Sequence, residues 1–271
     1  MKKQQNPPWE DLNPFLLSKI FSHLPIHDQL FGPPFVCHSW LSATLETLFH
    51  NSILDLRLID SLDDENQLSR FYHLLTLAIN HHQDWVSIYF PNEQVFGYFA
   101  TLYIAEQTPT ISSVVLPSDS CSNALPIYMS LLYWRNLRVF RARLDQSAWL
   151  SVLSQLADFC ENIVELGIHG DIEEKEVAYV VECFPRLEVL DFSESTLCGN
   201  ALGVVLDGRL KRLKELNILH CLIMGEDGEY VSADEYAKSK AFKNEVLQKA
   251  SGLRSLKKFR YCCDKSCTYC N

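Results

Sequence analysis

The chain has 271 residues, of which 47% are hydrophobic and 11% aromatic, and its formal net charge is −10. This apolar and aromatic content argues against a disordered chain. The acidic balance argues against a nucleic-acid-binding protein, which needs clustered positive charge. No apolar run follows the N-terminal lysines or approaches the ~20 residues of a membrane span, so we expect no signal peptide and no membrane partner. We therefore expect a protein of the nucleus or the cytoplasm, or both.

The first predicted elements lie in residues 9–50. Asn13 and Pro14 form a good helix start, because Asn caps the first turn and Pro loses no needed hydrogen bond there. This helix is expected to run to about residue 23, before the next proline, and it is apolar on nearly every side. A Gly-Pro-Pro break at 32–34 precedes a second predicted helix, which we expect to begin near Phe35.

The apolar surface of this segment exceeds what a module of about 40 residues can hide within itself. Burial of one leucine or phenylalanine side chain stabilises by roughly 1.5–3 kcal/mol, so the surplus is expected to meet other parts of the chain or another protein. Two compatible interpretations follow. The segment is a helical cap on the array that comes after it, a binding module for a partner, or both.

A repeated pattern occupies most of the remaining chain: an apolar residue, two others, an apolar residue, one other, and a third apolar or small residue. The copies are Ile53–Leu56–Leu58, Trp85–Ile88–Phe90, Ile111–Val114–Leu116, Leu137–Phe140–Ala142, Ile163–Leu166–Ile168, Leu187–Leu190–Phe192, Leu213–Leu216–Ile218 and Leu256–Phe259–Tyr261. From residue 85 to residue 213 the copies start 24 or 26 residues apart, and the last step is longer by an insertion.

A short strand followed by a helix every 20–29 residues is the period of leucine-rich repeats. The predicted fold class is therefore α/β, with parallel strands on the concave face of a solenoid and helices on the convex face. An ordinary α/β protein with parallel strands is the alternative, although no GxGxxG or Walker-type motif points to a nucleotide site. The first copy starts 32 residues before the second, a looser step than the others.

Three details accompany the repeats. Helices are predicted at 147–158, with Leu150, Leu153 and Leu156 on one face, and at 173–184, with Val177, Val180 and Val181 on one face. Eight positions after each start stand polar or thiol side chains that we expect to bond backbone amides as the chain leaves the strand. They are Glu93, Asp119, Asp145, Asp171, Ser195 and Cys221.

Residues 9–50 resemble the F-box motif. The matching residues, in the order and spacing of that motif, are Leu12, Pro14, Leu16, Leu17, Ile20, Phe21, Leu24, Pro25, Asp28, Leu30, Val36, Cys37 and Trp40, and Val-Cys-His-Ser-Trp is the most specific piece. The chain departs from the motif at Asn13, Phe15, His38, Leu41 and the Pro33-Pro34 pair. With its repeats of about 26 residues, the whole chain resembles the plant-type F-box/LRR group.

The resemblance implies a domain organisation and a function. The expected parts are a flexible N-terminus (1–8), an F-box (9–50), leucine-rich repeats (51–261, with an insertion at about 222–250) and a Cys-rich tail (262–271). Proteins of this group are substrate-recognition adaptors of SCF-type (Skp–cullin–F-box) E3 ubiquitin ligases and perform no chemistry. The expected partners are a Skp-type adaptor, a cullin scaffold through it, and a target protein that the sequence does not identify. No cofactor is expected.

Site residues follow from the resemblance and from the repeat geometry. By matching positions, the expected contacts with the Skp-type adaptor, or the support for them, are Leu12, Pro14, Leu16, Leu17, Ile20, Leu24, Pro25, Val36 and Trp40. Alternation along the strands places a second set on the outward face, where a target would dock: Tyr89, Arg141, Arg143, Glu165, His169, Asp191, Glu215 and Asn217. The alternative for this set is a solvated and mutually compensating group of charges.

The insertion is expected to contain a helix from about residue 233 to residue 250. Four cysteines follow the last repeat, and as zinc ligands Cys262, Cys263, Cys267 and Cys270 are weak candidates beside free thiols. No catalytic motif such as HExxH or a nucleophile elbow is present, so we expect no enzyme. The functional alternative is an LRR protein-interaction scaffold outside the ubiquitin system, with an F-box-like helical cap.

Overall fold

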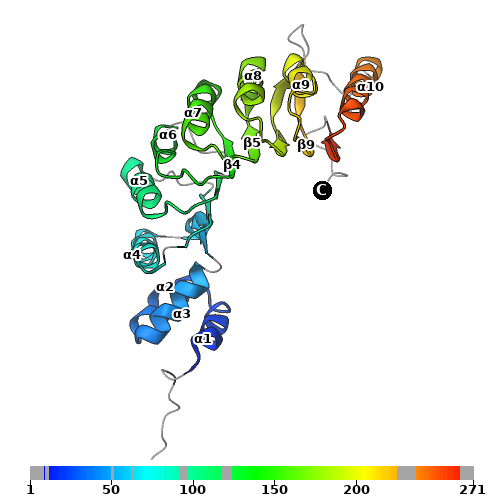
Figure 1. Cartoon of the computed structure of the whole chain (residues 1–271). Coiled ribbons are helices and arrows are strands. Elements are labelled where there is room, and N and C mark those ends of the chain that lie inside the picture. Colours follow the sequence, from blue (N-terminus) through cyan, green and yellow to red (C-terminus); the bar gives the residue numbers. More distant parts are fainter. Residues whose placement is uncertain are drawn as a thin grey trace, which may run out of the picture.

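The computed structural model describes residues 9, 12–49, 52–62, 64–82, 84–91, 97–116, 124–224 and 236–262, the last range with side chains from residue 244. Figure 1 shows a curved row of helices and strands, with the N-terminal helices at one end and the last strand at the other. The architecture is mixed α/β with a parallel sheet and N-terminal helices, as the sequence predicts at that level. No helix in these ranges is both long enough and apolar enough to cross a membrane.

Four short helical elements open the fold: α1 (Pro14–Phe21), α2 (Ile26–Phe31), the 3-10 turn η2 (Pro33–Phe35) and α3 (His38–Leu48). The predicted cap is present, because the side chain of Asn13 accepts the N–H of Phe15 at 2.9 Å. Two sequence predictions are wrong here. Helix α2 was not predicted, and the next helix begins at His38 and not near Phe35, because the two prolines shape a separate 3-10 turn.

The main sheet is parallel throughout, and each strand pairs with the next one along the chain. Within the described ranges its order is β1 (Ile53–Asp55), β2 (Ser87–Tyr89), β3 (Ser113–Val115), β4 (Val139–Arg143), β5 (Glu165–His169), β7 (Val189–Asp191), β9 (Glu215–Ile218) and β11 (Lys258–Tyr261). From the second copy of the repeat to the last, the middle apolar residues are register partners, for example Phe140 with Leu166. The predicted register is confirmed for these copies.

The first copy of the repeat is placed wrongly by the sequence. Leu54, and not Leu56, is the register partner of Ile88, so the pattern is shifted by two residues. Leu56 instead begins the 3-10 helix η3 (Leu56–Ser61) and is fully buried there. The looser spacing between the first two copies reflects this shift.

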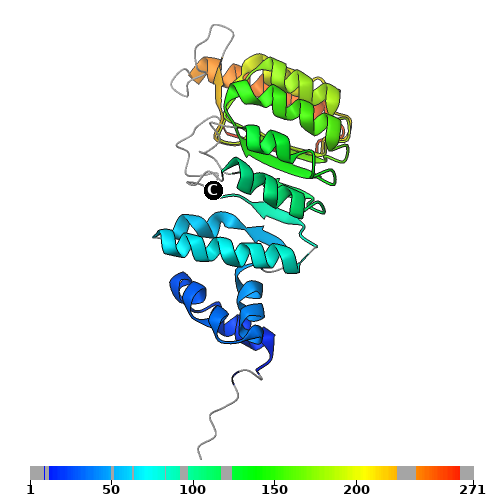
Figure 2. The ribbon, with the colours of Figure 1, turned by 90° about the vertical axis from the view of Figure 1, so that its left-hand side faces the viewer.

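Helices follow the strands along the convex side. They are α4 (Glu65–His81), α5 (Tyr98–Gln107), α6 (Leu125–Ser130), α7 (Gln146–Phe159), α8 (Glu174–Cys183), α9 (Gly199–Val205) and α10 (Tyr236–Gly252). Figures 1 and 2 show them stacked in chain order on the outer side of the curve, with the strands on the inner side. The predicted helices at 147–158, 173–184 and 233–250 correspond to α7, α8 and α10, and α10 begins three residues later than expected.

The core runs through the whole curve. One continuous cluster of buried side chains extends from Leu30 of α2 through the repeats to Ala250 of α10. In α8 the buried valines are those predicted. In α7 the buried residues include Trp149 and Val152, whereas Leu150 is 37% exposed, so the predicted leucine stripe is wrong by one position.

The chain leaves three strands through a turn with a left-handed residue. Gly170, Glu194 and His220 occupy equivalent positions, with φ of 118°, 58° and 58°. Each turn leads into a strand of a small second sheet that was not predicted, with order β10 (Leu222–Met224), β8 (Thr196–Cys198) and β6 (Asp171–Ile172). A side chain other than glycine costs roughly 1 kcal/mol or more in this conformation, so Glu194 and His220 are held by their surroundings.

The predicted role of the residue after this turn is only partly right. The hydroxyl of Ser195 accepts the N–H of Gly170 at 3.2 Å, as expected. The thiol of Cys221 instead donates to the carbonyl of Phe192 at 3.0 Å. Asp145 is exposed and makes no capping bond at the start of α7, which contradicts the prediction. Glu93 and Asp119 lie outside the described residues.

Candidate functional site

The N-terminal helices carry an exposed apolar face. It is formed by Phe15 (73% exposed), Leu16 (50%) and Ile20 (48%) of α1 together with Phe35 (55%) and Val36 (57%) at η2. Because α1 is apolar on all sides, α3 can cover only part of its surface. We use the name exposed apolar face for these five residues.

The structure divides the residues that the sequence predicts as adaptor contacts. Leu17 is 1% exposed and packs with Phe21 and Ala43 in a small core between α1 and α3. Exposed members are Pro14, Leu16, Ile20, Pro25 and Val36, and half-buried members are Leu12, Leu24 and Trp40. Only the exposed ones are available to a partner without rearrangement. Phe15 and Phe35 belong to the same face but are missing from the predicted set.

Trp40 supports the N-terminal helices from inside. Its ring lies 5.1 Å from the ring of Phe21, centroid to centroid, and its Nε1–H donates to the carbonyl of Trp9 at 3.2 Å. A substitution of Trp40 would therefore disturb the packing of α1 against α3. We assign Trp40 to the support of the exposed apolar face.

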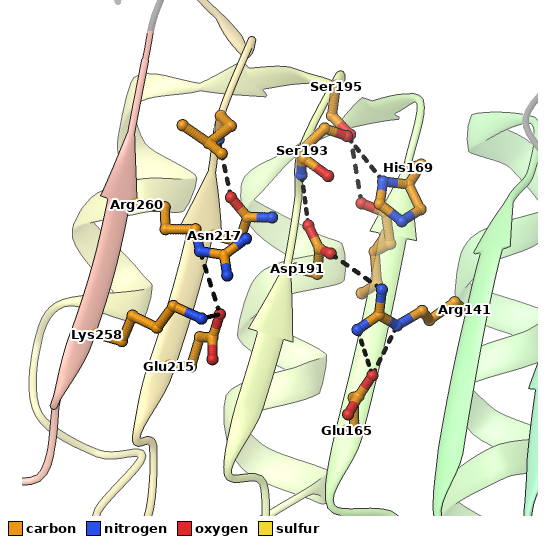
Figure 3. A network of polar contacts seen from close by, with 12 residues as sticks. Arg141, Glu165, His169, Asp191, Ser193, Ser195, Glu215, Asn217, Lys258 and Arg260 are labelled. Atoms are coloured by element: carbon orange, nitrogen blue, oxygen red, sulfur yellow. Dashed lines mark hydrogen bonds and ion pairs between the residues drawn. The ribbon is translucent and has the colours of Figure 1, made fainter. Parts of the chain in front are cut away.

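The second candidate site is a polar network on the concave face, drawn in Figure 3. At its centre, Nε and Nη2 of Arg141 lie 2.6 and 2.5 Å from Oε1 of Glu165. Nη1 of Arg141 lies 3.5 Å from Oδ2 of Asp191, two strands away. The predicted neighbourhood of these three charges is confirmed, and they compensate one another as the alternative interpretation had it.

Gly167 leaves room for the Arg141 side chain to cross strand β5. A Cβ atom at residue 167 would lie 2.8 Å from Cγ of Arg141 and 3.0 Å from Nε2 of His169. Glycine in the interior of a strand is otherwise unfavourable, by roughly 0.5–1 kcal/mol relative to alanine. The glycine is therefore explained by the path of Arg141.

We expect Gly167→Ala to destabilise the protein by about 1–3 kcal/mol, because the added methyl group overpacks this crossing. Urea unfolding followed by circular dichroism measures the effect. In an Arg141→Ala background the loss should shrink, because the obstructing side chain is gone. An equal loss in both backgrounds would contradict the role given to Gly167.

Asp191 and Asn217 are outward-facing in register but buried, which the sequence did not predict. Their exposed fractions are 6% and 9%. Oδ1 of Asp191 accepts the N–H of Ser193 at 2.9 Å, and Oδ1 of Asn217 accepts the N–H of Leu219 at 3.2 Å. Both side chains therefore hold the turn at the end of their strand, and little of either is available to a target.

His169 stands beside this network. Its Nδ1 lies 2.8 Å from the carbonyl oxygen of Ser193, which requires a proton on Nδ1. Burial lowers the pKa of His169 below its usual 6.5. The bond to Ser193 and the charge of Asp191 oppose this shift, whereas Arg143 and Arg141 add to it.

This pKa shift predicts a pH dependence of stability. Below the usual histidine pKa the unfolded chain takes up a proton that His169 resists in the folded state, so stability falls as the pH decreases. Between about pH 7 and about pH 5, the free energy of unfolding of His169→Asn should fall less than that of the wild type. Asparagine keeps a donor for Ser193. Parallel profiles would show that His169 does not carry the effect.

The remaining predicted target contacts lie around the network. Nη2 of Arg143 donates to the carbonyl of Glu194 at 3.0 Å. Glu215 pairs with Lys258 at 2.9 Å and with Arg260 at 3.5 Å on the last strand, as Figure 3 also shows. Tyr89 is separate, and its ring lies under the guanidinium of Arg57 at 4.7 Å. The predicted set is thus one central network with two flanking groups.

The described cysteines offer no activated thiol. Burial raises the pKa of Cys160 to about 12, and its thiol donates to the carbonyl of Trp134 at 3.4 Å. A nucleophilic cysteine needs the opposite shift. Within the ranges that the structure describes, no three His, Cys, Asp or Glu side chains are placed to hold a metal ion. Of the candidate zinc ligands, Cys263, Cys267 and Cys270 lie outside these ranges, and Cys262 is half-buried.

Comparison with known proteins supports the resemblance. No family model matches the chain. An F-box/LRR-repeat protein of Arabidopsis thaliana is 25% identical over 285 aligned positions, which cover 97% of this chain and 86% of the relative. The chain is related to the F-box/LRR-repeat proteins. A second Arabidopsis thaliana protein, provisionally named as an F-box protein, is 24% identical over 79% of this chain and 77% of its own length.

The F-box/LRR relationship covers both candidate sites, because the first alignment spans nearly the whole chain. The names of both relatives indicate F-box proteins, which are adaptors and not enzymes as a class. The exposed apolar face lies in the segment that resembles an F-box, and the polar network lies in the segment with the repeats.

Proposed function

We propose that this chain is a substrate-recognition adaptor of an SCF-type ubiquitin ligase. In this proposal α1 to α3 are an F-box that binds a Skp-type adaptor, and through it a cullin scaffold. The chain performs no chemistry itself. It holds a target protein close to the ubiquitin-conjugating enzyme and so raises the effective concentration of the target's lysines.

The exposed apolar face is the observation that carries the proposal. Its five side chains are 48–73% exposed and come from two elements that are close in the sequence. Burial of one such side chain is worth roughly 1.5–3 kcal/mol, and the cost of association subtracts from the sum. A soluble monomer rarely leaves this much clustered apolar surface uncovered, so the face is suited to a protein partner.

The N-terminal helices also cap the repeats, which supports a shared role. Leu45, Leu48 and Phe49 at the end of α3 belong to the same core as Leu54 of β1. One side of this segment therefore closes the array and the other presents apolar side chains. The boundary at residues 50/51 separates two functions and not two cores. The stretch 1–8 and most of the tail 262–271 lie outside the described residues.

For the repeats we propose a leucine-rich-repeat solenoid whose concave face binds the target. The most accessible candidates are Arg143, Glu215, Lys258 and Arg260, with Tyr89 on the first part of the face. Asp191 and Asn217 act through the turns that they hold. The target remains unnamed, and charge reversal at Lys258 and Arg260 is the variant that would reduce its capture without opening a buried pair.

Co-expression with a plant Skp-type adaptor tests the proposal. The wild-type chain should form a stable one-to-one complex in size exclusion, and the double variant Leu16→Glu, Ile20→Glu should lose it. Both positions are about half exposed, so the variant should keep its circular dichroism spectrum. Glutamate also has good helix propensity.

A matched control is Leu247→Glu, which places the same charge at a 40% exposed leucine of α10, far from the N-terminal helices. This variant should bind like the wild type. A folded wild-type chain that forms no complex would overturn the ligase proposal. The scaffold with an F-box-like cap would then be the better description, because the shared core already accounts for a cap.

A further inference from the structure

Arg70 of helix α4 lies against two aromatic rings of the N-terminal helices. Its guanidinium carbon is 4.7 Å from the ring centre of Phe35 and 5.7 Å from that of Phe31. Phe35 belongs to the exposed apolar face, whereas α4 is the first long helix of the repeats. The exposed apolar face therefore borders directly on a cation from another part of the chain.

Arg70 has no anionic partner among the described residues. No described carboxylate lies within 4.0 Å of its guanidinium nitrogens. The two nearby acids are otherwise engaged. Oδ1 of Asp28 is 3.2 Å from Nδ1 of His27, and Oδ1 of Asp64 accepts the N–H of Gln67 at 2.8 Å. Because it stacks by its face on Phe35, Arg70 keeps its donor edge free for a planar carboxylate.

A groove of about 620 Å³ lies beside Arg70, between α2 and α4. It is lined by His27, Phe31, Asn66, Ser69, Arg70 and His73, with Asp64 at the start of α4. Most of these side chains offer hydrogen-bond donors, and Asp64 already accepts a backbone N–H. In a chain with a net charge of −10, this wall suits an acidic group.

The position of Arg70 constrains any partner that covers Phe35. Such a partner removes water from Phe35 and also from the guanidinium 4.7 Å away. An unpaired cation that loses water is costly unless an opposite charge replaces the water. A partner surface of purely apolar side chains would therefore be penalised at this point.

We infer that the adaptor protein that covers the exposed apolar face also reaches α4 and places a carboxylate side chain on Arg70. This inference rests on the proposed function, because it names a contact of the same partner. It extends the binding surface from the N-terminal helices onto the repeats. The carboxylate enters the groove, bonds the free edge of Arg70 and has His27 and His73 within the same groove.

The affinity of the full-length chain for the Skp-type adaptor tests this contact, by calorimetry at low and at high salt. Arg70→Met keeps an apolar stem on Phe35 but removes the charge, and it should weaken binding about tenfold or more. Its affinity should also depend less on salt than that of the wild type. Arg70→Lys retains the charge and should bind more tightly than Arg70→Met. Arg254→Met, an exposed arginine at the opposite end of the array, is the matched control and should bind like the wild type.

The outcomes separate this inference from the proposed function. Wild-type affinity for Arg70→Met, with binding lost in Leu16→Glu, Ile20→Glu, overturns the contact at Arg70 and leaves the proposed function standing. Weak binding by Arg70→Glu alone would reflect repulsion by the new carboxylate and also overturns it. Absence of binding by the wild type overturns both. A change in self-association of the free chain, with unchanged adaptor affinity, would assign the groove to a second copy and overturn the inference. Equal thermal midpoints identify the variants that remain folded.

Discussion

Replacing Leu166 with alanine should lower the free energy of unfolding by about 2–5 kcal/mol. Leu166 is fully buried in strand β5, at the middle of the main sheet. Its register partners are Phe140 and Leu190 on the two adjacent strands, so the cavity would open between two repeats. Backbone pairing on both sides keeps the strands in place, and the cavity can collapse only partly. Urea unfolding monitored by circular dichroism gives the difference.

Leu150→Ala is the matched control for this substitution. The sequence places Leu150 in the buried stripe of its helix, but the residue is 37% exposed in α7. Its replacement should change stability by about 0.5 kcal/mol or less, because little apolar area is exposed to water and alanine favours helices. Equal losses for Leu150→Ala and Leu166→Ala would contradict the burial assigned to the two leucines.

The second large effect is expected at Asp191. Asp191→Ala removes the acceptor of the Ser193 N–H and one of the two carboxylates around Arg141. The unsatisfied N–H and the lost pair should together cost about 1–3 kcal/mol, because the carboxylate is 6% exposed. The same unfolding experiment measures this loss. A charge reversal at Asp191 would leave two cations together at a buried position, so it is a poor test of target docking.

Asp191→Asn separates the turn from the charge. In the next repeat Asn217 holds the equivalent turn through its own Oδ1, so an amide can serve here as well. The asparagine variant should therefore retain more stability than the alanine variant. If the two variants were equally destabilised, the ion pair with Arg141 would carry the effect and the hydrogen bond to Ser193 would contribute little.

The repeat pattern predicted the fold well because each copy carries its own apolar signal. Where strand and helix alternate at a constant step, one correct register determines the next, and Phe140, Leu166 and Leu190 fall in line. The first copy failed because two registers of Ile53–Leu58 have similar apolar content. The choice of Leu54 as the partner of Ile88 depends on packing that the local sequence does not contain.

The short elements were harder to predict. Helix α2 has six residues, too few for a periodic pattern, and its position depends on the burial of Leu30. In α7 both Trp149 and Leu150 fit a helical stripe, and the larger side chain is the one in the core. The small second sheet consists of strands of two or three residues, which have too few alternations to be recognised.

The candidate sites show the same division. The sequence selected the right residues in α1, but a helix that is apolar all round does not reveal which side α3 covers. Only the contact of Leu17 with Ala43 decides that Leu16 faces outward. On the concave face, alternation correctly placed Asp191 but not its burial, because the bond to Ser193 draws the carboxylate into the turn.

The continuous core has a consequence for reach. A flexible tether between an anchoring module and a capture surface lets a bound protein sample a wide volume, with a concentration that depends on tether length. Here packed side chains from Leu30 onward join the two ends, so the chain acts as a rigid bracket. Under the proposed function, a captured protein would be presented at one fixed distance and angle. Selection among its lysines would then follow from where they stand in space more than from their chemical surroundings.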